Sequence, residues 1–456
     1  MWFNSLAYGS LIHRTPAGVS EPGIASSWAY SNGGKTFTVQ LKSSVEFSDG
    51  CPVTAADVVS SVQYYQKNGT CANDLGNLAS VTASGPSTVV FQLSKPDPLL
   101  PYYLDQEDGA APIIAPSALA NPTSLSSATD GAGPYMLDAA ATVANSSYVY
   151  VPNPHYYDPS QQYWSKIVIE IITSDSSTLA ALQSGQVQAA EGYSTTASAA
   201  KAAGLKITAE QGDLAGVYLF DTNGSLVPAL KNLKVREALN YAINRKGIAK
   251  ALYGSYGVPT DQYEPNGAPG YQKSLANVYS FNPTKAKALL KSAKVKNLRF
   301  TLAVQPGAPG GTEIAQAMVQ EWSAIGVKVS IKTYTGFAGY VAALEQKKIA
   351  ATTFGYSYSV FVSMMDELWA PTGTYNLFGV NYPSENSLRA AINVAGTTSA
   401  TGVKDTNEAM KDAVDGAYGI PVVSTDTMIF STSAVSGINF SSTFPIPDPA
   451  EWTPGS

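Results

Sequence analysis

Charged residues are scarce in this chain of 456 residues. They make up 14% of it, compared with about 25% in an average soluble domain. The net charge is −6, and we identify no basic run or cluster. Since nucleic-acid binding needs a Lys/Arg footprint, we expect no nucleic-acid partner. The composition likewise gives no reason to expect the folded chain to bind an anionic membrane surface.

Long hydrophobic runs are also missing. No segment reaches the roughly 18 consecutive apolar residues of a membrane span. Apolar residues nevertheless make up an ordinary 45% of the chain, which indicates a globular protein and not a disordered one. The length is about three times that of a usual domain, so we expect two or three packed units.

Cysteine and histidine are nearly absent. Cys51 and Cys71 are the only cysteines, and an even count is compatible with a disulfide if the chain is exported. A helix of about 20 Å is expected between them, so both flanks would have to fold back to bring the Cα atoms within about 7 Å. The alternative is two separate buried thiols. With no close Cys pair, and with His13 and His155 far apart in sequence, we expect neither a metal site nor a cofactor.

Signatures of enzymes are mostly missing too. The sequence contains no G-x-S-x-G elbow, no P-loop and no G-x-G-x-x-G. Asp366-Glu367 is the best acidic pair, in a stretch that otherwise looks apolar and helical. Adjacent helical residues point about 100° apart, which suits a solvated helix face or a cap better than cooperation across a bond. We therefore predict that the chain is not an enzyme.

What is present begins with a strand, a turn and a capped helix over residues 28–65. Apolar and polar residues alternate over 36–41, the period of a half-buried strand. Gly50 tolerates the positive φ of a tight turn. Thr54 is a good N-cap, and Asp57 is placed to interact with the helix N-terminus.

This segment is the first of several blocks that resemble one family. The blocks are Pro22–Trp28, Thr36–Leu41, Val45–Val58, Gly131–Tyr135, Asn153–Tyr157, Leu179–Val187, Lys234–Arg245, Glu321-Trp322 and Ile325–Val329. Their order and content resemble the bacterial extracellular solute-binding proteins of the peptide, nickel and opine class (family 5), the substrate-binding components of ABC importers. The stretch KVREALNYAINR, which ends at Arg245, is the most specific match after the first segment.

Pattern and resemblance together give an expected architecture. We expect strands at 167–172, 216–220, 299–304 and 327–333 and helices near 176–184, 234–244, 285–292 and 312–325, an alternation typical of α/β lobes. The resemblance implies a two-lobed periplasmic-binding-protein-like fold (type II, cluster C) with an extra strand-rich subdomain and a hinge of two crossover segments. The expected ranges are 1–10, 131–230 and 420–456 for lobe I, 11–130 for its additional subdomain, and 231–419 for lobe II.

Because charges are few, the ligand pocket is expected to use aromatic and small polar groups, and 27 tyrosines are available. In peptide-binding relatives the segment matching 354–359 carries a Trp and an Asp that pairs with the ligand's free amine. Here Tyr356 and Ser359 stand at those positions, so either the ligand lacks a free amine or another acid, such as Asp366, takes that role. The candidate ligand-binding residues are Tyr356, Ser359, Tyr358, Tyr218, Tyr8 and Trp369, and packing at the lobe interface is the alternative role.

The expected function is capture of an oligopeptide or peptide-like solute by hinge closure, outside the cytoplasmic membrane and as a monomer. The partners implied by the resemblance are the permease subunits of an ABC importer. The N-terminus lacks the features of a signal peptide, so we expect that a signal and a short piece of lobe I precede Met1 in the natural protein. We expect the mature protein to be either free in the periplasm or anchored to the membrane as a lipoprotein. Alternatives are an oligosaccharide or other uncharged solute as ligand, an extracytoplasmic hydrolase, or a sensor domain.

Overall fold

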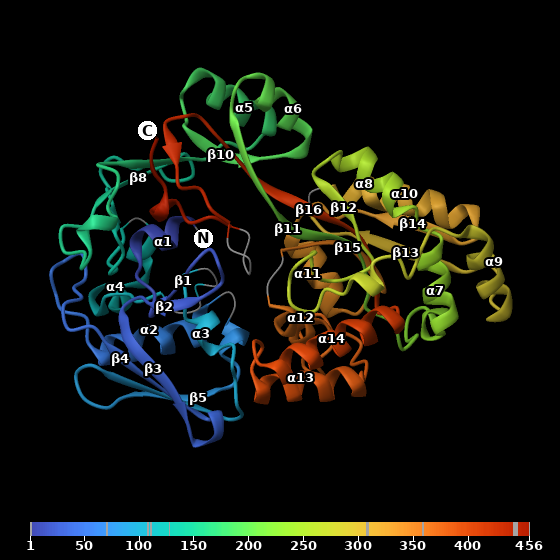
Figure 1. Ribbon diagram of the computed structural model, residues 1–456, viewed down its shortest axis with the longest axis horizontal. Helices are drawn as coiled ribbons and strands as arrows, with labels where there is room; N and C mark the ends of the chain where they lie inside the picture. Colours follow the sequence, from blue (N-terminus) through green and yellow to red (C-terminus); the bar gives the residue numbers. More distant parts are fainter. Residues whose placement is uncertain are drawn as a thin grey trace. The chain divides into compact units, whose positions relative to one another are not determined.

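The computed structural model describes residues 2–69, 72–106, 109, 112–126, 128–306, 310–357, 360–440 and 446–455. The chain divides into two compact units (Figure 1). Unit 1 comprises Met1–Ala209 and Met428–Ser456, and unit 2 comprises Glu210–Thr427. The boundaries fall within two long strands, β11 (Lys206–Leu219) and β16 (Gly419–Ser431).

Unit 1 is rich in strands. Its sheets have the orders β3-β4-β6-β5, β7-β8-β9, β1-β2 and β17-β18. Its strands are β1 (Ile12–Arg14), β2 (Ser20–Pro22), β3 (Ala25–Ser31), β4 (Thr36–Leu41), β5 (Leu78–Ala83), β6 (Thr88–Leu93), β7 (Tyr135–Leu137), β8 (Ser147–Pro152), β9 (Ile167–Glu170), β10 (Ala189–Gly192), β17 (Val435–Ser436) and β18 (Thr453–Pro454). Its helices are α1 (Trp2–Ala7), α2 (Ala55–Asn68), α3 (Leu100–Tyr103), α4 (Pro116–Ala120), α5 (Asp175–Ser184) and α6 (Ser194–Ala202).

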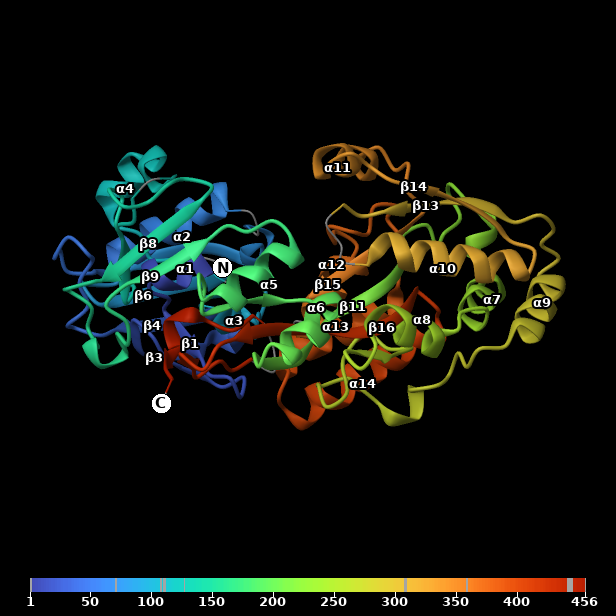
Figure 2. The ribbon, with the colours of Figure 1, turned by 90° about the horizontal axis from the view of Figure 1, so that it is seen from above.

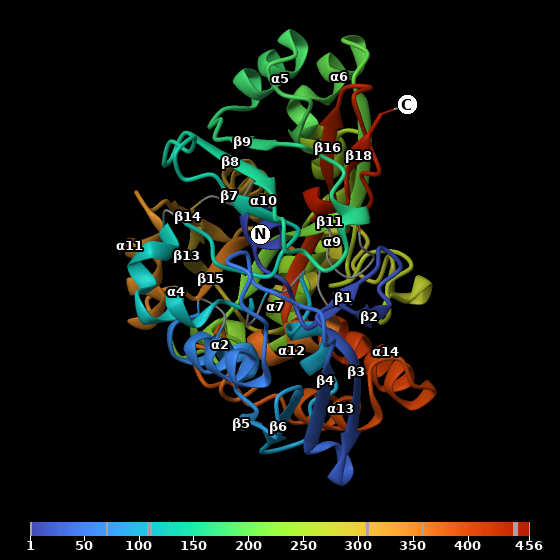
Figure 3. The same cartoon turned by 90° about the vertical axis from the view of Figure 1, so that its left-hand side faces the viewer.

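The strand, turn and helix predicted at 28–65 are confirmed. In β4 every second residue is buried, as the alternation required. Gly50 has a φ of 85°, and the Asp57 carboxylate accepts hydrogen bonds from the N–H (2.8 Å) and the hydroxyl (2.7 Å) of Thr54. Helix α2, which begins at the next residue, packs against β5 and β6, and Figure 3 displays it beside the four-stranded sheet.

Unit 2 is built on a mixed sheet. The order of the whole sheet, to which β10 of unit 1 also belongs, is β10-β16-β11-β15-β13-β14, with β12 paired to β16. Strand β13 is parallel to β14 and β15, whereas β11 is antiparallel to β15. The strands of this unit besides β11 and β16 are β12 (Gly257–Pro259), β13 (Arg299–Val304), β14 (Lys328–Lys332) and β15 (Ala351–Ser357). The helices are α7 (Leu233–Tyr241), α8 (Arg245–Tyr253), α9 (Pro283–Ser292), α10 (Gly311–Ala324), α11 (Phe337–Glu345), α12 (Phe361–Leu368), α13 (Pro383–Ala395) and α14 (Ala400–Asp415).

The core of unit 2 lies where α7 and α10 cover the sheet. Helix α10 packs along β13, β14 and β15 (Figure 2). Its Trp322 is fully buried among apolar residues of α7, α10, β11 and β13. The indole Nε1–H donates to the carbonyl oxygen of Leu239 at 3.0 Å, so the tryptophan's one polar atom is satisfied.

The predicted elements of unit 2 are present, and two of them differ clearly from their expected bounds. The strand expected over 216–220 begins earlier, at Lys206, and ends at Leu219. The helix expected over 234–244 ends at Tyr241. Asn244 is instead the N-cap of α8, and its side chain accepts a hydrogen bond from the N–H of Gly247 at 3.0 Å. Asparagine is a favoured N-cap, which explains the interruption of an otherwise helical pattern.

Candidate functional site

Unit 2 contains a small cavity, which we call the aromatic cavity. It is lined by Tyr218, Leu219, Phe220, Tyr263, Leu368, Trp369, Tyr375, Asn376, Tyr382 and Tyr418. Its volume is about 10 Å³, the space needed by one water molecule. A larger ligand group could enter only if lining side chains moved.

The lining side chains form two sets of ring contacts, one around Tyr218 and one around Trp369. Tyr218 stacks on Phe354 of β15, with an interplanar angle of 6°. The Trp369 ring meets Tyr263 edge-on at 5.1 Å between centroids and Tyr418 at 5.8 Å. Such offset and edge-to-face contacts each stabilise by about 0.5–1.5 kcal/mol beyond simple burial, so they hold the walls of the cavity in place.

Polar atoms reach the same lining. The Oη of Tyr218 is buried and has no hydrogen-bond partner among the described residues. The hydroxyls of Tyr382 and Thr222 lie 2.6 Å apart. The amide of Asn376 donates to two carbonyl oxygens and accepts from the N–H of Val380. The unpartnered Tyr218 hydroxyl is therefore the polar group of this lining that a water or a ligand could satisfy.

No lining residue carries a charge, and one of the acids nearby is deeply buried. Glu385 of α13 is 1% exposed, and neither of its carboxyl oxygens has a hydrogen-bond partner among the described residues. Burial, with a smaller contribution from Asp412, raises its pKa to about 9. Burial also raises the pKa of Tyr382 to about 12. The lining itself therefore offers hydroxyls and aromatic faces, and its Tyr418 hydroxyl donates to the Asp412 carboxylate at 3.2 Å.

The structure brings two of the predicted ligand-binding residues together. Tyr218 on β11 and Trp369, directly after α12, both line the aromatic cavity. Tyr356 is half-buried on β15, opposite Leu214 of β11, and is not among the lining residues. Tyr358 and Ser359 lie outside the described residues.

Tyr8 belongs to unit 1, where it packs beside Leu6, Tyr135 and Tyr150. Burial, followed by the charge of Asp130, raises the pKa of Tyr8 to about 12. As for the expected disulfide, Cys51 is exposed, whereas Cys71 lies outside the described residues. The disulfide stays a prediction.

The acidic pair singled out from the sequence lies on α12. The Asp366 carboxylate forms an ion pair with the Arg389 guanidinium of α13, so the acid proposed as a substitute amine anchor is already neutralised by a cation. In the part of the chain that the structure describes, no group of three or more His, Cys, Asp or Glu residues is arranged to hold a metal ion.

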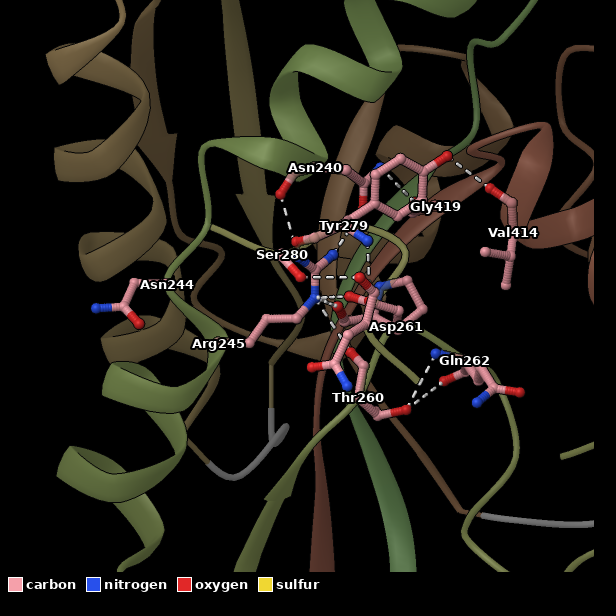
Figure 4. A network of polar contacts seen from close by, with 12 residues as sticks. Asn240, Asn244, Arg245, Thr260, Asp261, Gln262, Tyr279, Ser280, Val414 and Gly419 are labelled. Carbon is pink, nitrogen blue, oxygen red and sulfur yellow. Dashed lines mark hydrogen bonds and ion pairs between the residues drawn. The ribbon is translucent and has the colours of Figure 1, made fainter. Parts of the chain in front are cut away.

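The motif that ends at Arg245 has a structural role in unit 2 (Figure 4). The buried Arg245 guanidinium donates to the carbonyl oxygens of Thr260 and Pro421 at 3.1 and 2.7 Å, and to the Asn240 side chain at 2.7 Å. It also forms an ion pair with Asp261 at 2.8 Å. The network ties α7 and α8 to β16. Removing one partner of such a buried pair costs about 3–5 kcal/mol.

Four tyrosines of the lining were not identified from the sequence. They are Tyr263, Tyr375, Tyr382 and Tyr418. Tyr375 and Tyr382 lie in one segment between α12 and α13, whereas Tyr263 and Tyr418 are far from it in sequence. No periodic pattern groups the four, and the high tyrosine count was their only signal.

Comparison with known proteins identifies the family. The chain belongs to the bacterial extracellular solute-binding proteins, family 5, whose middle region it matches over residues 20–376. The probable D,D-dipeptide-binding periplasmic protein DdpA of Escherichia coli K12 is 28% identical over 320 residues, 68% of this chain and 60% of that protein. The glutathione-binding protein GsiB of Escherichia coli O157:H7 is 28% identical over 391 residues, 81% of this chain and 74% of that protein. The chain thus spans less than two thirds of DdpA.

Solved structures agree on the fold. A putative peptide binding protein AppA from Clostridium difficile has a TM-score of 0.83 at 19% identity, covering 99% of this chain and 95% of that one. The oligopeptide-binding protein AppA from Bacillus subtilis, in complex with a nonapeptide, has a TM-score of 0.80 at 19% identity, covering 100% and 94%. The fold is the α/β periplasmic-binding-protein fold that the sequence resemblance implied. None of the helices in the described ranges has the length and apolar character needed to cross a membrane.

Proposed function

We propose that this chain is the extracytoplasmic solute-binding protein of an ABC importer and that it captures an oligopeptide or peptide-like solute by hinge closure. The family match over residues 20–376 carries the proposal. The names of the relatives support the ligand class, since DdpA is described as binding D,D-dipeptides and GsiB as binding glutathione. Its partners are then the solute and the permease subunits at the membrane, and it works as a monomer.

We assign ligand contacts to Tyr218 and Trp369 of the aromatic cavity, with Tyr356, Tyr358, Ser359 and Tyr8 as further candidates. Tyr218 offers a buried hydroxyl for which the described residues supply no hydrogen-bond partner, and Trp369 offers an aromatic face. An aromatic wall with few polar groups suits the mixed apolar and polar surface of a peptide.

A second candidate ligand is an uncharged solute, such as an oligosaccharide or an amine-blocked peptide. The observation in its favour is that the cavity lining carries no charge, while Asp366 is held by Arg389. A buried ammonium needs a charged acceptor to compensate for lost hydration. This candidate differs from the first in the ligand and not in the transport role.

Mass spectrometry of the molecules that co-purify with the chain would identify its ligand class. A thermal-shift panel of free peptides, their N-acetylated forms and sugars should follow. At a hundredfold excess over Kd, a true ligand stabilises the folded chain by about 2.7 kcal/mol. A shift with free peptides alone would contradict the second candidate, and no shift with any member would contradict both.

Two conservative variants test the proposed contacts. Tyr218→Phe removes one hydroxyl and Trp369→Phe shortens one ring system, and each should weaken ligand binding by about 1–2 kcal/mol, five- to thirtyfold in Kd. Tyr271→Phe is the matched control, because Tyr271 is in unit 2 and does not line the cavity. Unchanged affinity in both cavity variants would remove the cavity from the binding site.

We propose a binding role without catalysis, in keeping with a family of solute-binding proteins. A hydrolase would convert the co-purifying ligand, and Asp366→Ala would abolish that conversion. Recovery of the ligand intact after prolonged incubation is the result expected of a binding protein.

A further inference from the structure

A second groove lies in unit 2, away from the residues of the aromatic cavity. It is lined by Lys287, Leu290, Lys291, Lys294, Val295, Lys296, Asn297, Leu298, Ile325, Gly326 and Val327, and has a volume of about 300 Å³. Helix α9 provides one side, and the segments leading into β13 and β14 provide the rest. Four lysines therefore border one concave surface, which we call the lysine groove.

The sequence around the groove is depleted of acids. No Asp or Glu occurs between Glu264 and Glu313, whereas that interval contains seven of the chain's 28 cationic residues. Those seven are Lys273, Lys285, Lys287, Lys291, Lys294, Lys296 and Arg299. The expectation that the chain has no basic cluster is therefore wrong: its overall charge of −6 does not show how unevenly the cationic residues are distributed.

The structure extends this cluster across neighbouring elements. Lys287 and Lys291 are four residues apart on α9 and so share one helix face. Arg299 at the start of β13 pairs in register with Lys328 of β14, the last strand in the sheet order. Figures 1 and 2 display α9 and β14 in the same part of unit 2.

The groove lysines are available to an external partner. All four are exposed, and among the described residues none forms an ion pair with an acid. Lys285 differs, because its ammonium donates to the Tyr241 hydroxyl at 2.6 Å and lies 3.8 Å from the centre of that ring. We therefore leave Lys285 out of the site.

We propose that the lysine groove and the adjoining cations bind the phosphate groups of anionic lipids at a membrane surface. Lysine ammonium groups are hydrated point charges that suit phosphate without the fixed fork geometry of arginine. Helix α9 is about 15 Å long, and the cations continue past its end to β13 and β14. That span is too wide for one phosphate and fits an array of headgroups, where each lysine adds to the attraction.

Co-sedimentation with lipid vesicles tests the proposal on the full chain. The probe is vesicles of equal parts phosphatidylglycerol and phosphatidylcholine, compared with phosphatidylcholine alone. The test variant replaces Lys287, Lys291, Lys294 and Lys296 with Gln. The control variant replaces Lys67, Lys95, Lys166 and Lys201 with Gln; these are exposed lysines of unit 1. Both variants change the net charge from −6 to −10, so only the position of the lost charge differs.

The unsubstituted chain and the control variant should bind the anionic vesicles, and the groove variant should bind at least about tenfold more weakly. Binding should also fall in 1 M salt, where the Debye length drops to about 3 Å. Equal losses in both variants, or no binding by the unsubstituted chain, would overturn the proposal. Complete competition by inorganic phosphate would assign the groove to a free anion, and equally strong binding of poly-glutamate would assign it to acidic polypeptides. Either result would also overturn it.

Discussion

Glu385 illustrates how a single buried acid can make the stability of this protein depend on pH. Its carboxyl group is almost fully buried and lacks a hydrogen-bond partner among the described residues. Burial raises its pKa from 4.5 to about 9. The folded chain therefore holds this proton at neutral pH, whereas the unfolded chain releases it above about pH 4.5. Since the unfolded state binds fewer protons in this range, the free energy of unfolding falls as pH rises.

Glu385→Gln should remove that dependence. Between pH 5 and pH 8 the variant should gain about 1.4 kcal/mol per pH unit relative to the unsubstituted chain. Below about pH 4.5 the acid is neutral in both the folded and the unfolded chain, so no such gain is expected there. Urea unfolding at several pH values measures the difference.

Glu345→Gln serves as the control, because Glu345 is exposed at the end of α11. Its stability profile should run parallel to that of the unsubstituted chain. A parallel profile for Glu385→Gln as well would mean that Glu385 is charged in the folded state.

At the scale of elements, short sequence patterns correctly predicted those structures that depend on residues close together in the chain. The alternation at 36–41 and the capping pair of Thr54 and Asp57 lie within a few residues of each other, and both are present in the structure. The aromatic cavity could not be predicted in the same way. Tyr218 and Tyr418 are two hundred positions apart. They reach one lining only because β11, which contains Tyr218, is the sheet neighbour of β16, which begins directly after Tyr418.

Two glycines of unit 2 should respond to the same substitution with opposite signs. A Cβ on Gly216 of β11 would lie 2.3 Å from the carbonyl oxygen of Ile420 on β16, so backbone would have to move. Gly339 is exposed in α11, and no atom lies within 4 Å of its Cβ position. Gly216→Ala should cost at least about 1–3 kcal/mol, whereas Gly339→Ala should stabilise by about 0.5–1 kcal/mol.

Urea unfolding followed by circular dichroism gives both values. The Gly339 variant controls for the added methyl group itself. A Gly216 variant as stable as the unsubstituted chain would mean that β11 and β16 separate easily, which would weaken their assignment as a closely packed pair.

For the whole molecule, the boundaries between the two units fall in only two strands, β11 and β16, and these are neighbours in one sheet. Two connections that lie side by side permit rotation of one unit against the other while resisting other movements, which is the geometry of hinge bending. The Arg245 network anchors β16 within unit 2 through the carbonyl oxygen of Pro421. Any bending should therefore occur beyond that residue, closer to the boundary.

Ligand binding by hinge closure should make the molecule more compact. Small-angle X-ray scattering should give a smaller radius of gyration at saturating concentrations of the ligand found by mass spectrometry. Tyr218→Phe should require a higher ligand concentration for the same contraction, because it removes the proposed hydroxyl contact at a position of β11 that lies within unit 2, away from the boundary at Ala209. If the ligand raised the melting temperature and the radius of gyration stayed constant, binding would not depend on closure. The two strands would then act as a fixed connection, since a ligand can shift only an equilibrium between states for which its affinities differ.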